Sequence, residues 1–287
     1  MKYCQKLILF IILGMGTAGS SPVLSQPVQV TAHPKTGALV EIKIMGDERD
    51  MNWVLKPDGT QYKWVNENHG WGLGFFTEKT GAETVERRWE IPDKSAGNGM
   101  VVSYKEGNIR IDVKREMENN DLIETYTFTN EGTSIITLNE IGINTPFNDN
   151  YPDAATCYRA RAHAHIWPGH NAAYVNATHM SGKGPHLGLA LTCGSIETYE
   201  LKERGRDKDK SNFRGVLILN PEDITLKPKE TYTLAWRIFV HNGNHDFYKK
   251  LAEYGSISAR SEKYVYEQGE TAYVEFVHSG KIGKAEI

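Results

Sequence analysis

The segment from Cys157 to Tyr174 carries the side chains of this sequence that are best suited to chemistry, since five of the ten histidines lie in it or shortly after it. His163 and His165 are two residues apart, so on a β-strand both imidazoles project from one face and can reach one ligand. Arg159 and Arg161 extend the same spacing toward the N-terminus. Because an Arg side chain can hold a carboxylate through two hydrogen bonds, this row predicts a site for the acid group of a uronic-acid-containing glycan.

The loop that follows this row adds an indole and further polar groups. Trp167 is followed by Pro, Gly, His170 and Asn171. An indole can stack on the apolar face of a sugar ring while neighbouring polar side chains bind its hydroxyls. We therefore place Trp167, His170 and Asn171 in the same predicted binding site. A second polar and aromatic loop, residues 66–72, permits the same interpretation.

A structural role is the alternative for each of these residues. The strand face could be merely solvated, its histidines could be hydrogen-bonded packing residues, and Trp167 could anchor its loop to the core. A metal site is disfavoured because the His163 and His165 pair has no third ligand at a recognisable spacing, whereas zinc needs at least three protein ligands. The sequence therefore predicts neither a metal nor another cofactor.

Catalytic residues cannot be assigned from the sequence. Glycoside hydrolysis usually needs two carboxylates that face one sugar. No such pair is marked, although Glu67, Asp149 and Asp153 fall in loops near the segments above. The sequence also lacks a Gly-rich phosphate loop, a Gly-x-Ser-x-Gly turn and a His-Glu-x-x-His motif, so nucleotide-binding, serine-hydrolase and zincin classes are set aside.

The elements that must position these residues are predicted to be β-strands. The clearest begins at Ile109 with strict alternation of apolar and polar residues, which places Ile109, Ile111 and Val113 on one buried face. The earlier strands predict an antiparallel meander with a turn at residues 130–132. Their number exceeds what one sheet usually holds, so we expect an all-β fold of two large packed antiparallel sheets. The strand-like stretches are residues 38–44, 72–76, 85–91, 109–117, 122–130, 135–143, 172–177, 187–193, 197–203, 213–219 and 231–240.

One short helix is predicted, near the C-terminus. Asn244 can cap it, Phe247, Leu251 and Tyr254 then share one face, and Gly255 ends it. We expect this helix to close a β-sandwich domain of residues 26–255. Residues 256–287 predict two more strands around Gly269, which either complete the sandwich or begin a further β module or linker that is incomplete in this chain.

The first 25 residues have the layout of a signal peptide. Lys2 and Lys6 precede an apolar run from Leu7 to Met15, and small and turn-forming residues follow. This pattern predicts a periplasmic or secreted protein. The apolar run is about half as long as the ~20 residues that span a bilayer, so no membrane association is expected after cleavage.

Charge and cysteine content narrow the partners further. The formal net charge is −3, with no basic block, which gives no reason to expect nucleic acid. Only Cys157 and Cys193 follow the predicted signal peptide. They could form one disulfide in an oxidising compartment or be two small buried packing residues on separate strands, and the sequence leaves both open.

Six segments have a familiar wording: Met51-Asn-Trp-Val, Trp71-Gly-Leu-Gly-Phe-Phe, Pro146-Phe-Asn-Asp-Asn-Tyr, His163-Ala-His-Ile-Trp, Pro185-His-Leu-Gly-Leu and Lys227-Pro-Lys-Glu-Thr-Tyr-Thr-Leu-Ala-Trp. Together they resemble the amino-terminal region of secreted bacterial six-hairpin (α/α)6 glycosidase-like proteins. The resemblance covers roughly residues 27–255 and implies a galactose-mutarotase-like β-supersandwich that precedes an (α/α)6 barrel. In that architecture the barrel usually supplies the catalytic acids and the sandwich contributes loops to the substrate groove.

The leading hypothesis is therefore a carbohydrate-binding or substrate-groove module of a glycoside hydrolase or polysaccharide lyase whose catalytic barrel is absent from this chain. Its partner would be an oligosaccharide or polysaccharide, with an acidic glycan favoured by the cationic row. One alternative is a self-contained sugar mutarotase or epimerase in which His163 or His165 is the general acid or base. Mutarotases use a His and a Glu inside the sandwich, but no matching motif is present here. Another alternative is a structural sandwich without a small-molecule site.

Overall fold

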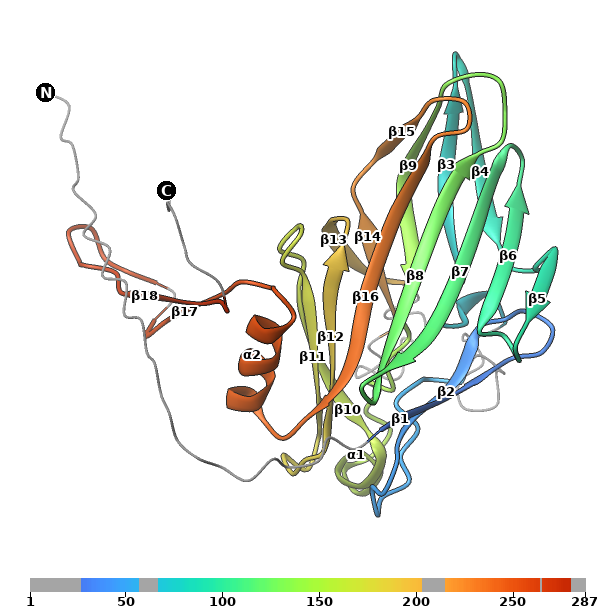
Figure 1. The fold of residues 1–287 in the computed structure, drawn as a ribbon. Coiled ribbons are helices and arrows are strands. Elements are labelled where there is room, and N and C mark those ends of the chain that lie inside the picture. The colour runs from blue at the N-terminus through green and yellow to red at the C-terminus, as the bar shows by residue number, and fades with distance from the viewer. Residues whose placement is uncertain (1–26, 57–66, 203–214, 264, 280–287) are drawn as a thin grey trace, which may run out of the picture.

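The computed structural model describes residues 27–56, 67–202, 215–263 and 265–279 (Figure 1). The predicted signal peptide, residues 1–25, lies outside these ranges. Strands make up most of the described chain, and two large antiparallel sheets pack against each other. The predicted all-β sandwich is confirmed. Within the described ranges, no helix is long and apolar enough to cross a membrane.

The larger sheet has eight strands in the order β10-β11-β12-β16-β8-β7-β6-β5, and every pair of neighbours is antiparallel. The predicted alternation in β7 is confirmed, because Ile109, Ile111 and Val113 are fully buried. The strands are β5 (Lys94–Ala96), β6 (Val101–Glu106), β7 (Ile109–Glu118), β8 (Asp121–Asn130), β10 (Ala162–Trp167), β11 (Tyr174–His179), β12 (His186–Cys193) and β16 (Thr231–His241).

The second sheet has six strands and covers the inner face of the first. Its order is β13-β14-β9-β3-β4, and β15 also pairs with β9. Its strands are β3 (Gly74–Thr80), β4 (Glu83–Trp89), β9 (Ile136–Asn144), β13 (Ile196–Lys202), β14 (Val216–Pro221) and β15 (Ile224–Leu226). A separate two-stranded sheet contains β1 (Val28–Ala32) and β2 (Leu39–Ile44).

Large aromatic side chains join the two sheets. The ring of Trp89 in β4 meets Phe128 in β8 edge to face, with the ring centroids 5.9 Å apart. The six-membered ring of this indole packs directly against Gly74 in β3, where any Cβ would collide with the ring. Both aromatic side chains are fully buried, so this contact contributes large apolar area to the core.

A buried ion pair also lies in the core. Arg115 Nε of β7 is 2.8 Å from Glu124 Oε1 of β8, and both side chains are fully buried. Glu124 Oε2 accepts hydrogen bonds from the indoles of Trp71 at 3.0 Å and Trp236 at 2.8 Å. Arg115 Nη1 donates to two backbone carbonyls, those of Gly37 and Gly99. These partners offset the cost of removing both charges from water.

The predicted meander is wrong after β8. β8 pairs with β7 on one side and with β16 on the other, and β9 belongs to the other sheet. The turn at residues 130–132 is therefore a crossing between sheets and not a hairpin. Asn130 holds this crossing, because its Nδ2 donates to the carbonyls of Ser134 and Leu226 and its Oδ1 accepts from the Gly132 amide.

The predicted C-terminal helix is confirmed as α2 (Asn244–Glu253), which packs through Phe247 and Leu251 on the outer face of the large sheet. Its N-cap is Gly243 and not Asn244, whose side-chain oxygen instead accepts from Asn176. The expectation of a single helix is wrong. A second helix, α1 (Ala154–Ala160), begins at Asp153, whose carboxylate accepts the Thr156 amide at 2.9 Å.

Two strands of the C-terminal segment pair with each other. The second of the predicted strands is β18 (Val274–Val277), but the first was expected between Glu262 and Gly269, whereas its place is taken by β17 (Ser258–Ser261) earlier in the chain; β17 and β18 form an antiparallel sheet of their own. The cysteines do not pair: Cys157 lies in α1, Cys193 is exposed at the end of β12, and both thiols are free. The exposure of Cys193 also excludes the alternative of two buried packing residues.

Candidate functional site

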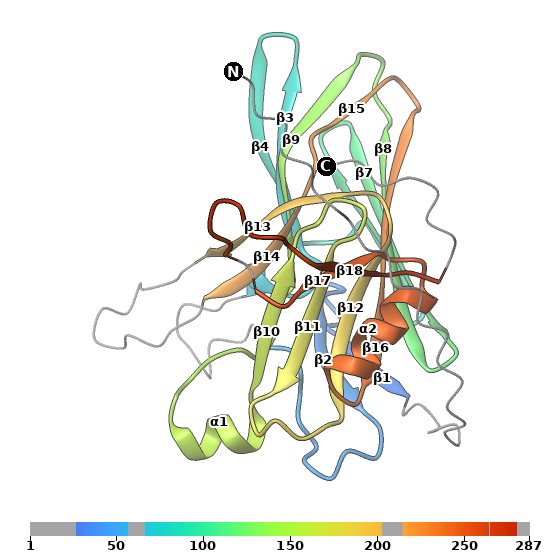
Figure 2. The same ribbon diagram turned by 90° about the vertical axis from the view of Figure 1, so that its left-hand side faces the viewer.

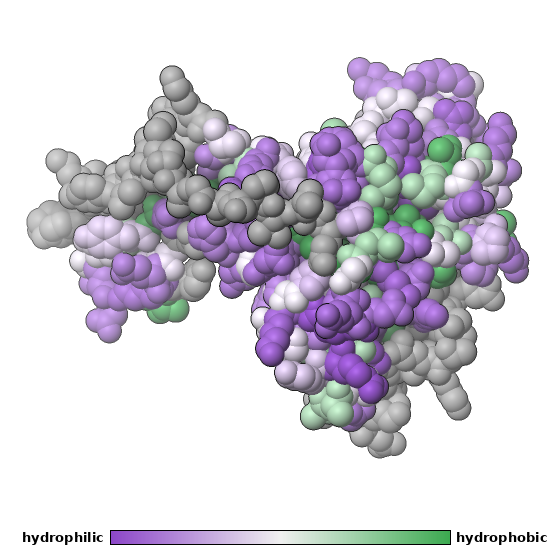
Figure 3. Space-filling view, turned by 60° about the horizontal axis from the view of Figure 1, so that its bottom comes forward, coloured by the Kyte–Doolittle hydropathy of each residue, from purple (hydrophilic) through white to green (hydrophobic). Residues whose placement is uncertain are grey.

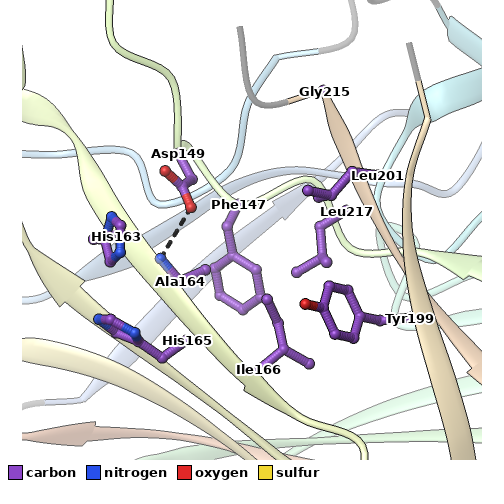
Figure 4. Close-up of a pocket in the computed structure, with 10 residues that line it drawn as sticks. All are labelled: Phe147, Asp149, His163, Ala164, His165, Ile166, Tyr199, Leu201, Gly215 and Leu217. Atoms are coloured by element: carbon purple, nitrogen blue, oxygen red, sulfur yellow. Dashed lines mark hydrogen bonds between the residues drawn. The ribbon is translucent and has the colours of Figure 1, made fainter. Parts of the chain in front are cut away.

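A cleft of about 280 Å³ opens where an edge strand of each sheet meets the other (Figure 4). These edge strands are β10 of the large sheet and β13 of the small one. They are joined at one end by two backbone hydrogen bonds between His170 and Ile196, and the cleft lies beside β10 beyond that bridge. Its lining residues are Phe147, Asp149, His163, Ala164, His165, Ile166, Tyr199, Leu201, Gly215 and Leu217.

The cleft combines an apolar base with polar groups at its rim. Phe147 and Leu217 are nearly fully buried, and Phe147 is fixed edge to face against Trp71 with the centroids 5.0 Å apart. Tyr199 of β13 is exposed and projects into the cleft opposite β10 (Figure 4). An apolar base with a few convergent polar groups is the usual composition of a site for a small ligand, and it suits a sugar ring.

The predicted placement of the two histidines on one strand face is confirmed. His163 and His165 lie on β10 with ring centroids 4.4 Å apart, while the intervening Ala164 points inward and is buried. The hydroxyl of Tyr151 shares a hydrogen bond with His163 Nδ1, and the two rings are stacked. His163 is thus held by a neighbour, and His165 is the more exposed of the two.

Asp149 closes the edge of β10 next to the histidines. Its Oδ2 accepts the backbone amide of Ala164 at 3.0 Å, the bond drawn in Figure 4. The preceding residue contributes as well, because the Asn148 carbonyl accepts the Ala162 amide at 3.0 Å. The segment before α1 therefore takes the place of a further strand along β10 and brings one carboxylate into the cleft.

The prediction that Arg159 and Arg161 continue the histidine face is wrong. Arg159 lies in the last turn of α1, and Arg161 is the C-cap, with Nη1 donating to the Ala160 carbonyl at 2.7 Å. The spacing of two residues aligns side chains only in a strand, and β10 starts at Ala162. Neither Arg lines the cleft.

Trp167, His170 and Asn171 lie at the end of β10 but do not line the cleft. Trp167 continues the strand face of the two histidines and is 55% exposed, so it does not anchor its loop to the core. His170 adopts a left-handed conformation with φ of 52° and bridges Ile196 through its backbone. The indole of Trp167 is therefore exposed beside the cleft, and its role in binding a sugar stays a prediction.

The second loop singled out in the sequence has a structural role at Trp71. This indole is fully buried and donates to Glu124, so it belongs to the core. Glu67–His69 form a short 3-10 helix, and Asn66 lies outside the described residues. Of the acids considered, Asp153 caps α1 and Asp149 reaches the cleft.

Two tyrosines at the site were not singled out as binding residues in the sequence: Tyr199, which lines the cleft, and Tyr151, which bonds to the cleft residue His163. Tyr151 stands twelve residues before its partner His163, and Tyr199 belongs to the opposite sheet. Alternation in residues 197–203 signals a strand but does not reveal which strand it faces. Only the Pro146 to Tyr151 segment, quoted above for its resemblance, gave a local signal.

The glycan site predicted from the sequence implies that replacing Gly169 with Ala weakens glycan binding about three- to tenfold, because the new Cβ would collide with the Trp167 indole and displace it from its place beside the cleft. Titration calorimetry with an acidic oligosaccharide would measure the effect, with Trp167→Ala as the reference for complete loss of the ring. Gly169→Ala with wild-type affinity would argue against an indole platform.

Neither a family model nor a curated protein sequence matches the chain. A solved structure, however, superposes on 91% of the chain with a TM-score of 0.85 and 52% sequence identity. The chain is similar to a polysaccharide lyase. It spans 38% of the length of that lyase.

Weaker similarity extends to two other carbohydrate-active proteins. A GH36 α-galactosidase, AgaB from Geobacillus stearothermophilus, aligns with 82% of this chain and 42% of its own at 11% identity and a TM-score of 0.46. A galactose mutarotase related enzyme from Lactobacillus acidophilus aligns with 77% of this chain and 99% of its own at 8% identity and a TM-score of 0.46.

Proposed function

We propose that this chain is a carbohydrate-binding module of a polysaccharide-degrading protein and that the cleft beside β10 holds an acidic sugar of the substrate. The observation that carries the proposal is the cleft itself, whose lining combines two adjacent imidazoles on one face of β10 with apolar side chains on the other side of the strand. The similarity to a polysaccharide lyase supports a carbohydrate ligand.

His163, His165 and Tyr199 suit a uronate, while Asp149, whose Oδ2 accepts the Ala164 amide, is the one acid among the described residues of the lining. His163 and His165 can donate hydrogen bonds to the two oxygens of one carboxylate, and either ring attracts that anion when it is protonated. Tyr199 offers a hydroxyl from the opposite wall, and the ring of Phe147 supplies an apolar surface for the sugar. Trp167, at the end of β10 on the face of the two histidines, would offer a separate apolar surface to the next sugar of a chain.

The module would act as part of a larger exported protein. The lyase to which it is similar is more than twice as long as the aligned region, because that region covers 38% of its length. We propose that an additional domain, such as the (α/α)6 barrel implied by the resemblance, supplies the catalytic groups while β10 and β13 hold the substrate. Residues 1–25 would direct the protein to the periplasm or the exterior.

The experiment is a calorimetric titration of residues 26–287 with oligosaccharides of polygalacturonate, alginate and glucuronoxylan. The double variant His163→Ala/His165→Ala is expected to bind the best of these at least about tenfold more weakly, since it loses two charge-assisted hydrogen bonds. Its melting temperature should stay close to that of the wild type, because His165 is exposed and His163 is only half-buried.

The matched control is His245→Ala, which removes an exposed imidazole from α2, outside the cleft. It should bind as the wild type does. If the double variant and the control bind equally well, the ligand does not occupy this cleft.

A second candidate, a sugar mutarotase or epimerase, is favoured by one observation. The hydrogen bond between Tyr151 and His163 is the kind of pairing that orients an imidazole for proton transfer. Under this hypothesis the protein accelerates the interconversion of hexuronate anomers, and Tyr151→Phe slows it. An interconversion rate equal to that in buffer would exclude the candidate while leaving the binding role intact.

A further inference from the structure

A second cleft, of about 610 Å³, lies at the end of the sandwich that comes forward in Figure 3, where the surface is mostly hydrophilic. Three segments meet there: the C-terminal half of α1, the turn between β11 and β12, and the loop after β2. Figure 2 shows α1 at this end of the molecule beside β10. Arg159, which the sequence predicted to accompany the histidines, belongs to this cleft instead.

The loop after β2 is braced against the turn by Arg49. Its Nη1 donates to the Lys183 carbonyl at 2.6 Å and its Nη2 to the Pro185 carbonyl at 3.1 Å. Its Nε is 2.9 Å from Asp47 Oδ1, so the charge of that carboxylate is compensated. The guanidinium of Arg49 therefore links the loop after β2 to the turn between β11 and β12.

The turn is braced against α1 by His179, which is almost fully buried. Its Nε2 donates to the Arg159 carbonyl at 3.1 Å, so Nδ1 is the unprotonated nitrogen and accepts from the Ser181 hydroxyl at 2.7 Å. Burial lowers the pKa of His179, which keeps the ring in this neutral form. The three walls are therefore fixed to one another before any ligand arrives, which reduces the entropy cost of binding.

The groups left to contact a ligand are two cations and an aromatic ring. The side chains of Arg159 and Lys183 are exposed and form no ion pair with any of the described residues. Tyr158, also in α1, is 60% exposed next to Arg159. With Asp47 compensated by Arg49, Glu48 is the single remaining acid of the lining, so cationic groups predominate.

We infer that this second cleft binds a carboxylate-bearing sugar, with Arg159 and Lys183 on the acid group and Tyr158 against the ring. The inference rests on the proposed function, since it assigns a second anionic subsite to the same acidic glycan. Arg159 and His163 are four residues apart on consecutive elements, so one polysaccharide chain can engage both clefts and gain affinity by avidity.

The test compares Arg159→Gln/Lys183→Gln with the wild type by affinity electrophoresis through gels that contain polygalacturonate, alginate or glucuronoxylan. Both side chains are exposed, so the variant should fold normally. It should bind the polymer about three- to tenfold more weakly, and the difference should shrink in high salt because exposed charges are screened. Lys94→Gln/Lys249→Gln, which loses the same charge elsewhere on the surface, should bind as the wild type does.

The histidine variant separates this inference from the proposed function. If Arg159→Gln/Lys183→Gln binds like its charge-matched control while His163→Ala/His165→Ala loses binding, the second subsite is overturned and the proposed function stands. If the wild type itself is not retarded by any of the three polymers, both are overturned.

Discussion

Replacing Glu124 with Leu is expected to lower the free energy of unfolding by about 3–5 kcal/mol, the typical cost of leaving one partner of a buried ion pair uncompensated. The variant leaves the Arg115 guanidinium buried without its counter-ion. It also removes Glu124 Oε2, which accepts hydrogen bonds from the indoles of both Trp71 and Trp236. Both indoles are fully buried and would lose this acceptor. For a domain of this size the loss corresponds to a fall in melting temperature of roughly 6–20 °C.

Urea denaturation of the wild type and the variant measures this effect directly. The informative control is Arg115→Met/Glu124→Leu, which removes both charges and should recover much of the lost stability, because apolar side chains of similar size can replace a buried ion pair. A Glu124→Leu variant that loses less than about 1 kcal/mol would mean that water or a rearranged partner compensates Arg115.

Acidification is expected to destabilise the protein steeply below about pH 6.5. Burial lowers the pKa of both His186 and His241 to about 4; Arg49 and His179 add to the effect at His186, and His186 adds to it at His241. Asp246 opposes the shift at His241 without reversing it. In the unfolded chain these imidazoles take up a proton near pH 6.5, whereas in the folded chain they resist it.

The direction of the change in unfolding free energy follows from the number of protons that each state binds. Between about pH 6.5 and pH 4 the unfolded state binds more protons than the folded state, so the stability present above pH 6.5 is lost as the pH falls. Each histidine contributes a slope of about 1.4 kcal/mol per pH unit, or roughly 3 kcal/mol over the whole window.

Urea denaturation at a series of pH values would measure this slope. His186→Asn/His241→Gln should flatten it, and His245→Asn, which changes an exposed imidazole, should leave it unchanged. A double variant with the wild-type slope would place the pH dependence in other groups, such as the carboxylates.

Strand alternation made most of the sandwich predictable. In β7 and β8 the apolar faces are encoded residue by residue, and the same pattern contained a signal for the buried ion pair. Arg115 follows Ile109, Ile111 and Val113 on the same face, and β-sheet register places it opposite Glu124. When two neighbouring strands each carry a residue of opposite charge at a core position, the pattern therefore predicts a cross-strand ion pair.

The candidate site was only partly predictable, because it is made by two sheets. His163 and His165 carry a local signal, since their spacing fits a strand and the strand is present. Arg159 was misplaced because Asp153 caps a helix that interrupts the expected strand. Tyr199 carries no signal of its neighbourhood to β10, because the edges of β10 and β13 meet only once both sheets are assembled.

The most direct test of the proposed acidic-glycan cleft is to compare one oligouronate with its carboxyl-reduced counterpart, which has the same linkages and hydroxyls but no acid groups. The cleft of His163 and His165 predicts that reduction weakens calorimetric binding at least about tenfold, and that this penalty largely disappears in His163→Ala/His165→Ala. Equal affinity for the acidic and reduced oligosaccharides would contradict recognition of a carboxylate by this chain.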